Sequence, residues 1–386
     1  MHTPKVMIIA GEASADLHGE KLVDALKAKA PGLQAFGIGG PGMRSHGFEA
    51  IVPSEDISVA GLTEVLFAIP RIWRIMRRIT AVARERRPDV AVLIDMPDFN
   101  LRLAKRLNTL NIPVVYYISP QLWAWRQGRV KQIRERVDKM LVILPFEKDF
   151  YEKHGVPVEF VGHPLIEELP LDTNRDGARE RLTLTKHKGP LIAVLPGSRH
   201  KEVSRHLPVM LAGLLRLKEK FPGLRPVIPV AHTIDRAMVE RSVAASGLEA
   251  DIVDGHATDV LLASDAALVC SGTSTLQTAL LLRPMVVVYR VSWLSYQILK
   301  RLVKVAHIAL VNLIAGRALA PELIQNAMTP KAIADAVEPF LDDSPLAEET
   351  RAAFRGLRAQ LGDGNTAERV ADAVLPYFDK PGRNAP

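Results

Sequence analysis

Short apolar runs alternate with helix-like segments along most of this chain, and this alternation restricts the possible folds more than any other feature. Runs typical of buried strands occur at 6–10, 90–94, 114–118, 140–144, 191–195, 226–230, 251–253, 266–270 and 285–289. Helical patterns follow most of these runs. A repeated strand–helix order predicts an α/β fold, with doubly wound parallel sheets that are covered by helices on both faces.

The strand–helix order lapses in residues 169–189, where polar residues and glycines interrupt it. A chain of 386 residues is also longer than one ordinary domain. We therefore expect two domains, 1–168 and 169–345. The charged, mostly helical tail at 346–386 is expected to pack back on the first domain or on a partner chain.

The charge balance favours an anionic partner. The formal net charge is +7 and the pI is near 9.4, which suits a phosphorylated substrate, an anionic membrane surface or nucleic acid. Only 5% of the residues are aromatic, and no RNA-binding aromatic signature is present, so nucleic acid is the least favoured of the three. The single cysteine, Cys270, excludes an internal disulfide. No apolar run is long enough to span a bilayer, so we expect a soluble or peripheral protein.

Two loops in the second half have the composition of anion-binding sites. Gly197, Ser198 and Arg199 follow the run 191–195 and precede a helical segment. A helix N-terminus offers free amides, and arginine adds charge-assisted hydrogen bonds to phosphate. The loop after the run 266–270 also opens a helix, with the polar or small residues Ser271, Gly272, Thr273, Ser274 and Gln277. A solvated arginine and ordinary helix capping are the alternatives, but the two loops together favour a diphosphate held between neighbours.

Acidic residues that follow strands in the first half suit proton transfer. Asp98 comes just after the run 90–94, where its carboxylate can project from the strand end as a general base. Asp95 is the competing candidate, although its place at the strand end favours a structural role in the following turn. Further candidates in the first loop are Glu12, Ser14, Asp16 and His18, with helix capping as the alternative for Asp16.

Two other patterns give little support to redox or metal chemistry. Residues 37–42 match the GxGxxG pattern, but they follow the second predicted strand and not the first, which makes them a weak dinucleotide signal. We interpret them as a loop whose backbone comes close to a substrate or another element. The histidines are scattered, and Asp95 with Asp98 forms an isolated carboxylate pair, so no metal site is expected.

A basic apolar stretch at 65–79 and two tryptophans are candidates for contact with lipid. Helices that mix bulky apolar residues with arginine can lie in an anionic membrane interface. The residues concerned are Val65, Leu66, Phe67, Ile69, Ile72, Trp73, Arg74, Arg77 and Arg78. A core-facing helix with a solvated basic face explains the stretch equally well. Trp123 and Trp125 suit an acyl chain, a sugar or the core.

Taken in order, these segments resemble one family, the lipid-A-disaccharide synthases, which are two-domain glycosyltransferases of the GT-B class. The resemblance covers nearly the whole chain and rests on residues 11–16, 37–43, 58–66, 95–100, 117–125, 144–147, 160–165, 195–199, 271–277 and 311–317. So many ordered matches are more specific than any single motif. The resemblance implies a GT-B fold, in which two Rossmann-like domains with doubly wound parallel sheets face each other across a cleft.

The resemblance also implies a reaction at the cytoplasmic face of the inner membrane. UDP-2,3-diacylglucosamine would donate its sugar, with inversion, to the 6-hydroxyl of 2,3-diacylglucosamine 1-phosphate. The products would be UDP and a β-1,6-linked disaccharide 1-phosphate, formed without a metal or a redox cofactor. The family pattern assigns the base to Asp98, the donor phosphate to Arg199, and the remaining donor contacts to 271–277 and to Asn312, Glu322 and Gln325. A homodimer through the helical tail is a further expectation.

Two positions depart from the family pattern. Ala15 stands where we expect glycine, and Gln277 stands where relatives have a glutamate that contacts the donor ribose. Glutamine can accept a hydroxyl hydrogen bond but loses the charge assistance, which affects donor affinity more than the fold. Three alternatives stay open: a UDP-N-acetylglucosamine 2-epimerase-like isomerase, a non-catalytic UDP-sugar-binding protein and, more distantly, a nicotinamide oxidoreductase.

Overall fold

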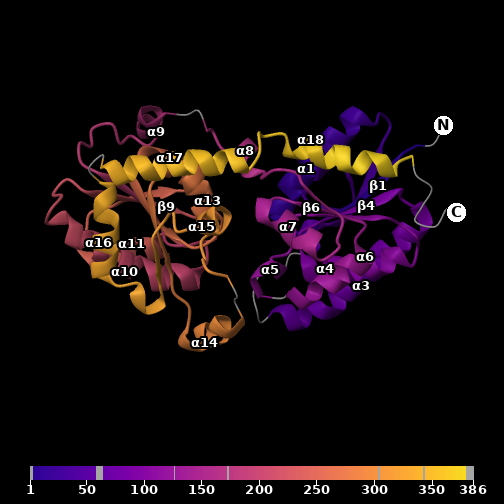
Figure 1. The fold of residues 1–386 in the computed structure, drawn as a ribbon, viewed down its shortest axis with the longest axis horizontal. Coiled ribbons are helices and arrows are strands. Elements are labelled where there is room, and N and C mark those ends of the chain that lie inside the picture. The colour runs from indigo at the N-terminus through magenta and orange to yellow at the C-terminus, as the bar shows by residue number, and fades with distance from the viewer. Residues whose placement is uncertain are drawn as a thin grey trace. The chain divides into compact units, whose positions relative to one another are not determined.

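The chain folds into two compact units. The structure, a computed structural model, describes residues 3–57, 64–125, 127–171, 174–302, 305–341 and 344–379, without the side chains at 64–68, 294, 298, 299 and 302. Unit 1 comprises Met1–Pro164 and Leu361–Pro386, and unit 2 comprises Leu165–Gln360. Each unit contains one parallel sheet (Figure 1).

Unit 1 is built on a seven-stranded sheet with the order β3-β2-β1-β4-β5-β6-β7. Its strands are β1 (Lys5–Ala10), β2 (Gln34–Gly39), β3 (Glu49–Pro53), β4 (Val90–Ile94), β5 (Val114–Tyr117), β6 (Lys139–Val142) and β7 (Val158–Phe160). Its helices are α1 (Ala13–Lys29), α2 (Pro41–Ser45), α3 (Glu64–Arg86), α4 (Pro97–Asn108), α5 (Leu122–Trp125), α6 (Val130–Arg136), α7 (Pro145–Lys153) and α18 (Thr366–Val374), with single 3-10 turns at Ser54–Asp56, Gln127–Arg129 and Leu375–Tyr377.

The central strands of unit 1 are buried on both faces, which explains their unbroken apolar sequences. Successive residues of a strand point to opposite faces. In β1, Met7 and Ile9 pack in one hydrophobic cluster, whereas Val6, Ile8 and Ala10 pack in another. Residues of α3 and α4 join the first cluster, and residues of α1 and α18 join the second. Helices therefore cover both faces of this sheet (Figure 1).

Unit 2 is built on a six-stranded sheet with the order β10-β9-β8-β11-β12-β13. Its strands are β8 (Leu191–Leu195), β9 (Arg225–Val230), β10 (Asp251–Asp254), β11 (Ala266–Cys270), β12 (Met285–Tyr289) and β13 (Glu322–Ile324). Its helices are α8 (Leu165–Glu168), α9 (Arg175–Arg181), α10 (His200–Lys218), α11 (Arg236–Ser246), α12 (Ala257–Ala263), α13 (Thr273–Leu280), α14 (Trp293–Leu302), α15 (Leu310–Ala315), α16 (Pro330–Val337) and α17 (Pro345–Gln360), with 3-10 turns at Gln325–Ala327 and Glu338–Phe340. The predicted α/β class with two doubly wound parallel sheets is confirmed.

The predicted C-terminal tail is divided between the two units. The chain passes from unit 1 to unit 2 after residue 164 and returns to unit 1 after residue 360, whereas the boundaries expected from the sequence were 168 and 345. The reason lies in packing, because Ala347 of α17 joins the hydrophobic cluster of unit 2. In unit 1, α18 lies beside α1 (Figure 1), where Lys29 Nζ is 2.9 Å from Glu368 Oε2. A homodimer through the tail stays a prediction.

Candidate active site

The polar loops of unit 1 meet where its strand order changes direction. β1 and β4 are neighbours, and the chain builds the sheet outward from them to both edges. Ala10 pairs with Ile94, so the two strands end at the same level. In sheets of this kind ligands bind beyond the carboxyl ends of the strands at this reversal. Glu12 follows β1 and residues 95–98 follow β4, so the fold brings these candidates to one sheet end.

The turn after β4 is strained. Asp95 and Met96 have positive φ angles of 49° and 45°, which residues with side chains rarely adopt. The Asp95 carbonyl oxygen accepts a hydrogen bond from the Tyr116 hydroxyl (2.5 Å) and another from the Asn100 amide (2.7 Å). Burial raises the pKa of the Asp95 carboxyl, and the charge of Glu12 adds to the rise. Strain that neighbouring groups enforce in this way is a common mark of functional loops.

Asp98 presents an accessible carboxylate at this turn. It lies in the first turn of α4 after Pro97, and 70% of its side chain is exposed. Arg129 donates from Nη2 to Asp98 Oδ1 at 2.7 Å. Nothing in the sequence marks Arg129 as a partner of Asp98, because it belongs to no motif and the contact joins residues 31 positions apart. The ion pair fixes one carboxylate oxygen of Asp98 beside the strand end.

The candidates in the first loop occupy different environments. Glu12 and Ser14 are exposed at the start of α1, whereas Asp16 is buried. Burial lowers the pKa of His18 to about 4, and the charge of Lys21 adds to the decrease. The imidazole is therefore neutral near pH 7 and a weak base. Its ring packs edge-on against Tyr117, with 6.2 Å between the ring centroids.

Asp16 anchors the glycine-rich segment. Its carboxylate accepts hydrogen bonds from the Gly40 amide (2.7 Å), the Gly42 amide (2.8 Å) and the Met43 amide (3.2 Å). The predicted loop at 37–42 differs in part, because Gly37 to Gly39 belong to β2 itself. A Cβ atom at Gly40 would lie 2.4 Å from Asp16 Oδ2. Close approach to another element therefore explains the glycine pattern. Asp16 lies inside α1, whose N-cap is Glu12, so it does not cap its own helix and instead holds the amides of the segment 40–43.

Trp123 belongs to a buried polar cluster. It is 7% exposed, and its Nε1–H donates to Glu147 Oε1 at 3.0 Å. Glu147 also accepts from the Leu144 amide (3.2 Å), and nearby Ser119 Oγ lies 3.0 Å from the Tyr151 hydroxyl. Burial raises the pKa of Glu147 to about 7, against the lowering effect of the Trp123 hydrogen bond. Trp123 is thus part of the core, whereas Trp125 is 43% exposed.

We expect the buried carboxyl of Glu147 to make stability depend on pH. Its pKa is about 7 when folded, against an ordinary value of 4.5, so the native state binds the proton more tightly than the unfolded chain. Its contribution to the free energy of unfolding is complete below pH 4.5 and is lost as the pH rises through 7, by at most about 3 kcal/mol. Glu147→Gln should lack this decline in denaturant unfolding at pH 5 to 8. Glu152→Gln, an exposed control on the same helix, should keep it, and equal slopes for all three proteins would contradict the assignment.

One face of α3 carries exposed apolar side chains. Ile69 and Trp73 are 45% and 51% exposed, whereas Ile75 and Ile79 are buried in the core. The Arg106 guanidinium lies over the Trp73 ring, 5.4 Å from its centroid. The remaining candidates are half-buried Ile72 and exposed Arg74, Arg77 and Arg78. The side chains of Val65, Leu66 and Phe67, and residues 58–63, lie outside the part that the structure describes.

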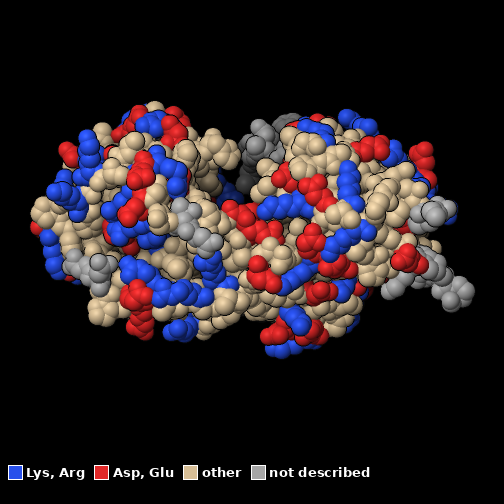
Figure 2. Space-filling view, turned by 90° about the horizontal axis from the view of Figure 1, so that it is seen from above, with Lys and Arg blue, Asp and Glu red and all other residues tan. Residues whose placement is uncertain are grey.

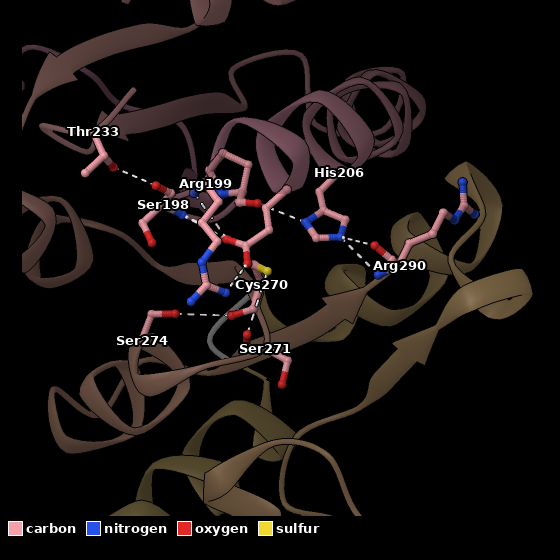
Figure 3. A network of polar contacts seen from close by, with 10 residues as sticks. Ser198, Arg199, His206, Thr233, Cys270, Ser271, Ser274 and Arg290 are labelled. Atoms are coloured by element: carbon pink, nitrogen blue, oxygen red, sulfur yellow. Dashed lines mark hydrogen bonds and ion pairs between the residues drawn. The ribbon is translucent and has the colours of Figure 1, made fainter. Parts of the chain in front are cut away.

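In unit 2 the two candidate anion-binding loops also follow neighbouring strands at the point where the strand order reverses. β8 and β11 are neighbours at the reversal of strand order, and Leu195 pairs with Val269. The loop 197–199 therefore leaves the sheet next to the loop 271–274, as Figure 3 shows. The structure thus brings together the two loops that the sequence analysis assigns to a diphosphate.

The first of these loops already holds a carboxylate. Glu202, in the first turn of α10, accepts from the Ser198 amide (3.2 Å) and the Arg199 amide (3.3 Å) through Oε2. Arg199 Nη1 lies 3.1 Å from Glu202 Oε1, and the Arg199 side chain is 81% exposed. Gly197 has φ of +122°, and a Cβ atom there would lie 2.5 Å from Glu202 Oε2. Only glycine fits this turn without displacing Glu202.

The second loop uses its hydroxyl groups locally. Ser274 Oγ donates to the Cys270 carbonyl at 3.1 Å, and Ser271 Oγ donates to the Ile308 carbonyl at 3.4 Å. Gly272 and Thr273 stand at the start of α13. Gln277 lies one turn further along α13, and its Nε2 donates to Thr258 Oγ1 at 3.0 Å. The Gln277 side chain is thereby oriented by α12.

Asn312 and Glu322 stabilise the segment between β12 and β13. Glu322 accepts from the amides of Ile308 (3.0 Å) and Ala309 (3.1 Å) and from Asn312 Nδ2 (2.8 Å). Asn312 is fully buried, and its Oδ1 accepts from the Ala320 amide at 2.9 Å. Gln325 has a positive φ of 55°, and its carbonyl accepts from Arg290. These contacts hold Asn312 and Glu322 in place within unit 2, and their predicted contact with the donor stays a prediction.

The positive net charge is not gathered into a single patch on the face that Figure 2 shows. Lysine and arginine lie among aspartate and glutamate there. Ion pairs such as those of Arg225 with Asp251 and of Arg236 with Asp254 also pair the two signs of charge in unit 2. Within the described residues, no group of three or more His, Cys, Asp or Glu side chains could hold a metal ion. None of the described helices is both long and apolar enough to cross a membrane.

Comparison with known proteins identifies close relatives. The family model described as "Lipid-A-disaccharide synthetase" matches residues 6–371. The lipid-A-disaccharide synthase of Anaeromyxobacter dehalogenans (strain 2CP-C) is 53% identical over 374 residues, which cover 97% of each chain. That of Myxococcus xanthus (strain DK1622) is 46% identical over 380 residues, 98% of this chain and 99% of the relative.

Solved structures with low sequence identity share the fold. The UDP-GlcNAc 2-epimerase from Neisseria meningitidis, solved with UDP-GlcNAc bound, has a TM-score of 0.65 at 12% identity, with 96% of this chain and 100% of that chain covered. The calicheamicin glycosyltransferase CalG4 has a TM-score of 0.58 at 17% identity, with both chains fully covered. At such identities these likenesses establish the GT-B architecture and leave the reaction open.

Proposed function

The chain belongs to the lipid-A-disaccharide synthase family, a family of glycosyltransferases, and we propose that it transfers 2,3-diacylglucosamine from UDP to the 6-hydroxyl of 2,3-diacylglucosamine 1-phosphate. The family match along residues 6–371 carries this proposal. The products would be UDP and the β-1,6-linked disaccharide 1-phosphate. A single displacement would invert the configuration at the anomeric carbon.

In this reaction Asp98 would act as the general base. An inverting transfer needs one base within hydrogen-bond reach of the acceptor hydroxyl. Asp98 would take the 6-hydroxyl proton while the new glycosidic bond forms and the bond to UDP breaks. Arg129 holds Oδ1 at 2.7 Å and leaves the exposed carboxylate accessible. The charge of Glu12 acts on the Asp95 carboxyl in the same turn. Neutral His18 could donate or accept a hydrogen bond with the acceptor.

The loops of unit 2 would stabilise UDP as it leaves. A departing diphosphate accumulates negative charge, which fixed positive groups and amides stabilise. Arg199 offers an exposed guanidinium, and the loops at the N-termini of α10 and α13 offer backbone amides and hydroxyl groups. These groups could replace a metal ion, so we propose that the transfer needs neither a metal nor a redox cofactor.

We further propose that the protein works at the cytoplasmic face of the inner membrane. Both substrates would carry acyl chains, which stay in a bilayer while the sugar reaches the site. Ile69 and Trp73 offer exposed apolar area on α3, next to exposed arginines that suit anionic lipid. A tryptophan ring also suits the interface, because it is apolar with one polar edge.

We expect the exposed face of α3 to control membrane binding. The double variant Ile69→Ser/Trp73→Ser should bind vesicles that contain anionic phospholipid several-fold more weakly in co-sedimentation, because it loses the two large apolar side chains that are exposed on the described part of α3. The control Leu215→Ser/Leu346→Ser removes side chains of similar exposure, 40% and 46%, from unit 2. Equal binding by wild type and both variants would contradict the proposed role of α3 in membrane binding.

The chemical structure of the product tests the proposed reaction. Wild-type protein should be incubated with both lipid substrates in detergent micelles, and the lipid product analysed by mass spectrometry and NMR. We expect a disaccharide 1-phosphate with a β-1,6 linkage. An α linkage would contradict the proposed inversion, and a linkage to a hydroxyl other than the 6-hydroxyl would contradict the proposed position of attack. Epimerised UDP-sugar without a lipid product would favour the isomerase alternative.

A further inference from the structure

Two carbonyl oxygens of the loop 196–199 are held by side chains with no role in the proposed reaction. His206 Nδ1 lies 2.9 Å from the Pro196 carbonyl oxygen, and Thr233 Oγ1 donates to the Ser198 carbonyl oxygen at 2.6 Å. His206 belongs to α10 and Thr233 follows β9, so the two contacts reach the loop from different elements. Figure 3 shows both contacts beside Arg199.

These contacts determine where the loop amides point. In a trans peptide the C=O and the following N–H point in opposite directions, because the peptide group is planar. The Pro196 carbonyl faces His206, so the Gly197 N–H points away from His206. In the same way, the bond from Thr233 to Ser198 turns the Arg199 N–H away from Thr233. Gly197 has φ of +122°, and its missing side chain would let this peptide rotate easily without such contacts.

His206 is itself held in one orientation. It is fully buried, and its Nε2 lies 2.9 Å from the Arg290 backbone nitrogen and 3.1 Å from the Arg290 carbonyl oxygen. The Pro196 carbonyl oxygen can only accept, so Nδ1 carries a proton and donates it in this contact. The Arg290 guanidinium in turn donates to the Gln325 carbonyl at 3.0 Å. The histidine thus joins the loop after β8 to the end of β12 and to the turn after β13.

The loop orientation that these contacts enforce already receives a negative group. Glu202 Oε2 accepts from the Ser198 amide at 3.2 Å and from the Arg199 amide at 3.3 Å. The first distance is at the long end of the normal range for N–H···O bonds and the second is just beyond it, and Arg199 is largely exposed. The carboxylate shows that the Arg199 amide, whose direction the Thr233 contact sets, accommodates an anion. The Pro196 contact with His206 sets the direction of the neighbouring Gly197 amide in the same loop.

We propose that His206 and Thr233 are positioning residues that hold the loop 196–199 with its amides turned toward the diphosphate of the nucleotide substrate. They touch loop carbonyls and not the substrate, so they act through the loop. The inference rests on the proposed function, because it assigns the bound anion to UDP. It adds a prediction that the family match does not contain: donor affinity depends on the Nδ1–H of one buried imidazole.

Two amide substitutions separate the two contacts of His206. In His206→Asn the new amide nitrogen would lie near the place of Nδ1 and could still donate to Pro196. In His206→Gln the longer side chain would reach Arg290 and lose the Pro196 contact. We expect His206→Gln to raise the Kd of UDP by about tenfold or more in calorimetry, and His206→Asn to stay within about threefold of wild type. A role in core packing alone would affect both variants alike. Equal affinities of the two variants, or weaker binding by His206→Asn, would overturn the proposal.

Thr233 provides the second test if the buried substitutions disturb folding. Thr233→Val removes the hydroxyl, whereas Thr233→Ser keeps it. We expect about tenfold weaker UDP binding only for valine, and equal binding by both variants would overturn the proposal.

Inorganic pyrophosphate, used as a second ligand, distinguishes a wrong nucleotide function from a wrong positioning role of His206 and Thr233. If the wild-type protein binds pyrophosphate but not UDP, the proposed nucleotide function is wrong. The His206 and Thr233 variants are then compared by their affinity for pyrophosphate. Wild type that binds neither would overturn both.

Discussion

Asp98→Asn should lower turnover by about 10²–10⁴-fold, the usual effect of removing a general base, while leaving the fold and UDP binding unchanged. Asparagine keeps the size of the side chain and can still accept a hydrogen bond from Arg129 through its amide oxygen. It cannot take the proton from the acceptor hydroxyl at a useful rate. The measurement is the steady-state rate of UDP release with both lipid substrates, together with UDP titration by calorimetry.

Asp363→Asn is the matched control for this experiment. Asp363 lies in the same unit, is 61% exposed and pairs with Arg369 at 2.8 Å, so it resembles Asp98 in exposure and in its arginine partner. This control should keep wild-type turnover. Near-normal turnover in Asp98→Asn would assign the base elsewhere, with Asp95 and Glu12, whose charges interact at the same strand end, as the remaining candidates.

Arg199→Ala should weaken UDP binding by about 10- to 100-fold. A hydrogen bond to a charged group contributes roughly 1.5–3 kcal/mol, and each 1.4 kcal/mol corresponds to about tenfold in Kd. The exposed guanidinium forms its ion pair with Glu202 at the surface, so it can turn to a diphosphate without breaking a buried contact. Calorimetry with UDP, followed by the same titration with uridine, measures the phosphate contribution directly.

Arg216→Ala supplies the control for charge alone. Arg216 is an exposed arginine toward the other end of α10, so its removal changes the net charge equally without touching the strand-end loop. UDP affinity should be unchanged in this variant. If Arg199→Ala and Arg216→Ala bind UDP as wild type does, Arg199 does not contact the donor phosphate.

The central strands were predictable because their surroundings leave a clear trace in the sequence. A strand covered by helices on both faces needs apolar residues at every position, and β1, β4, β8 and β11 fulfil this almost completely. The edge strands β3, β7, β10 and β13 are only partly buried. Only β10 was predicted, and the other three were not. Their sequences are short and mixed in polarity, so no continuous apolar run marks them.

The candidate site was predictable only in part, for a related reason. Residues that directly follow buried strands, such as Asp98 and Arg199, are found by the rule that ligands bind at strand ends. Arg129, His206 and Thr233 lie on other elements, and their contacts with the loops arise only when those elements pack. The roles of Asn312 and Glu322 also needed coordinates, because a polar residue that binds a ligand and one that caps a neighbouring segment look alike in sequence.

The most direct test of the central claim is UDP release by the purified protein in detergent micelles, with UDP-2,3-diacylglucosamine as donor, in the presence and absence of 2,3-diacylglucosamine 1-phosphate. We predict that UDP release depends on the acceptor and matches disaccharide formation mole for mole, which would also show that Gln277 supports donor binding. UDP binding without acceptor-dependent release would contradict the proposed transfer and make Gln277→Glu the next variant to measure.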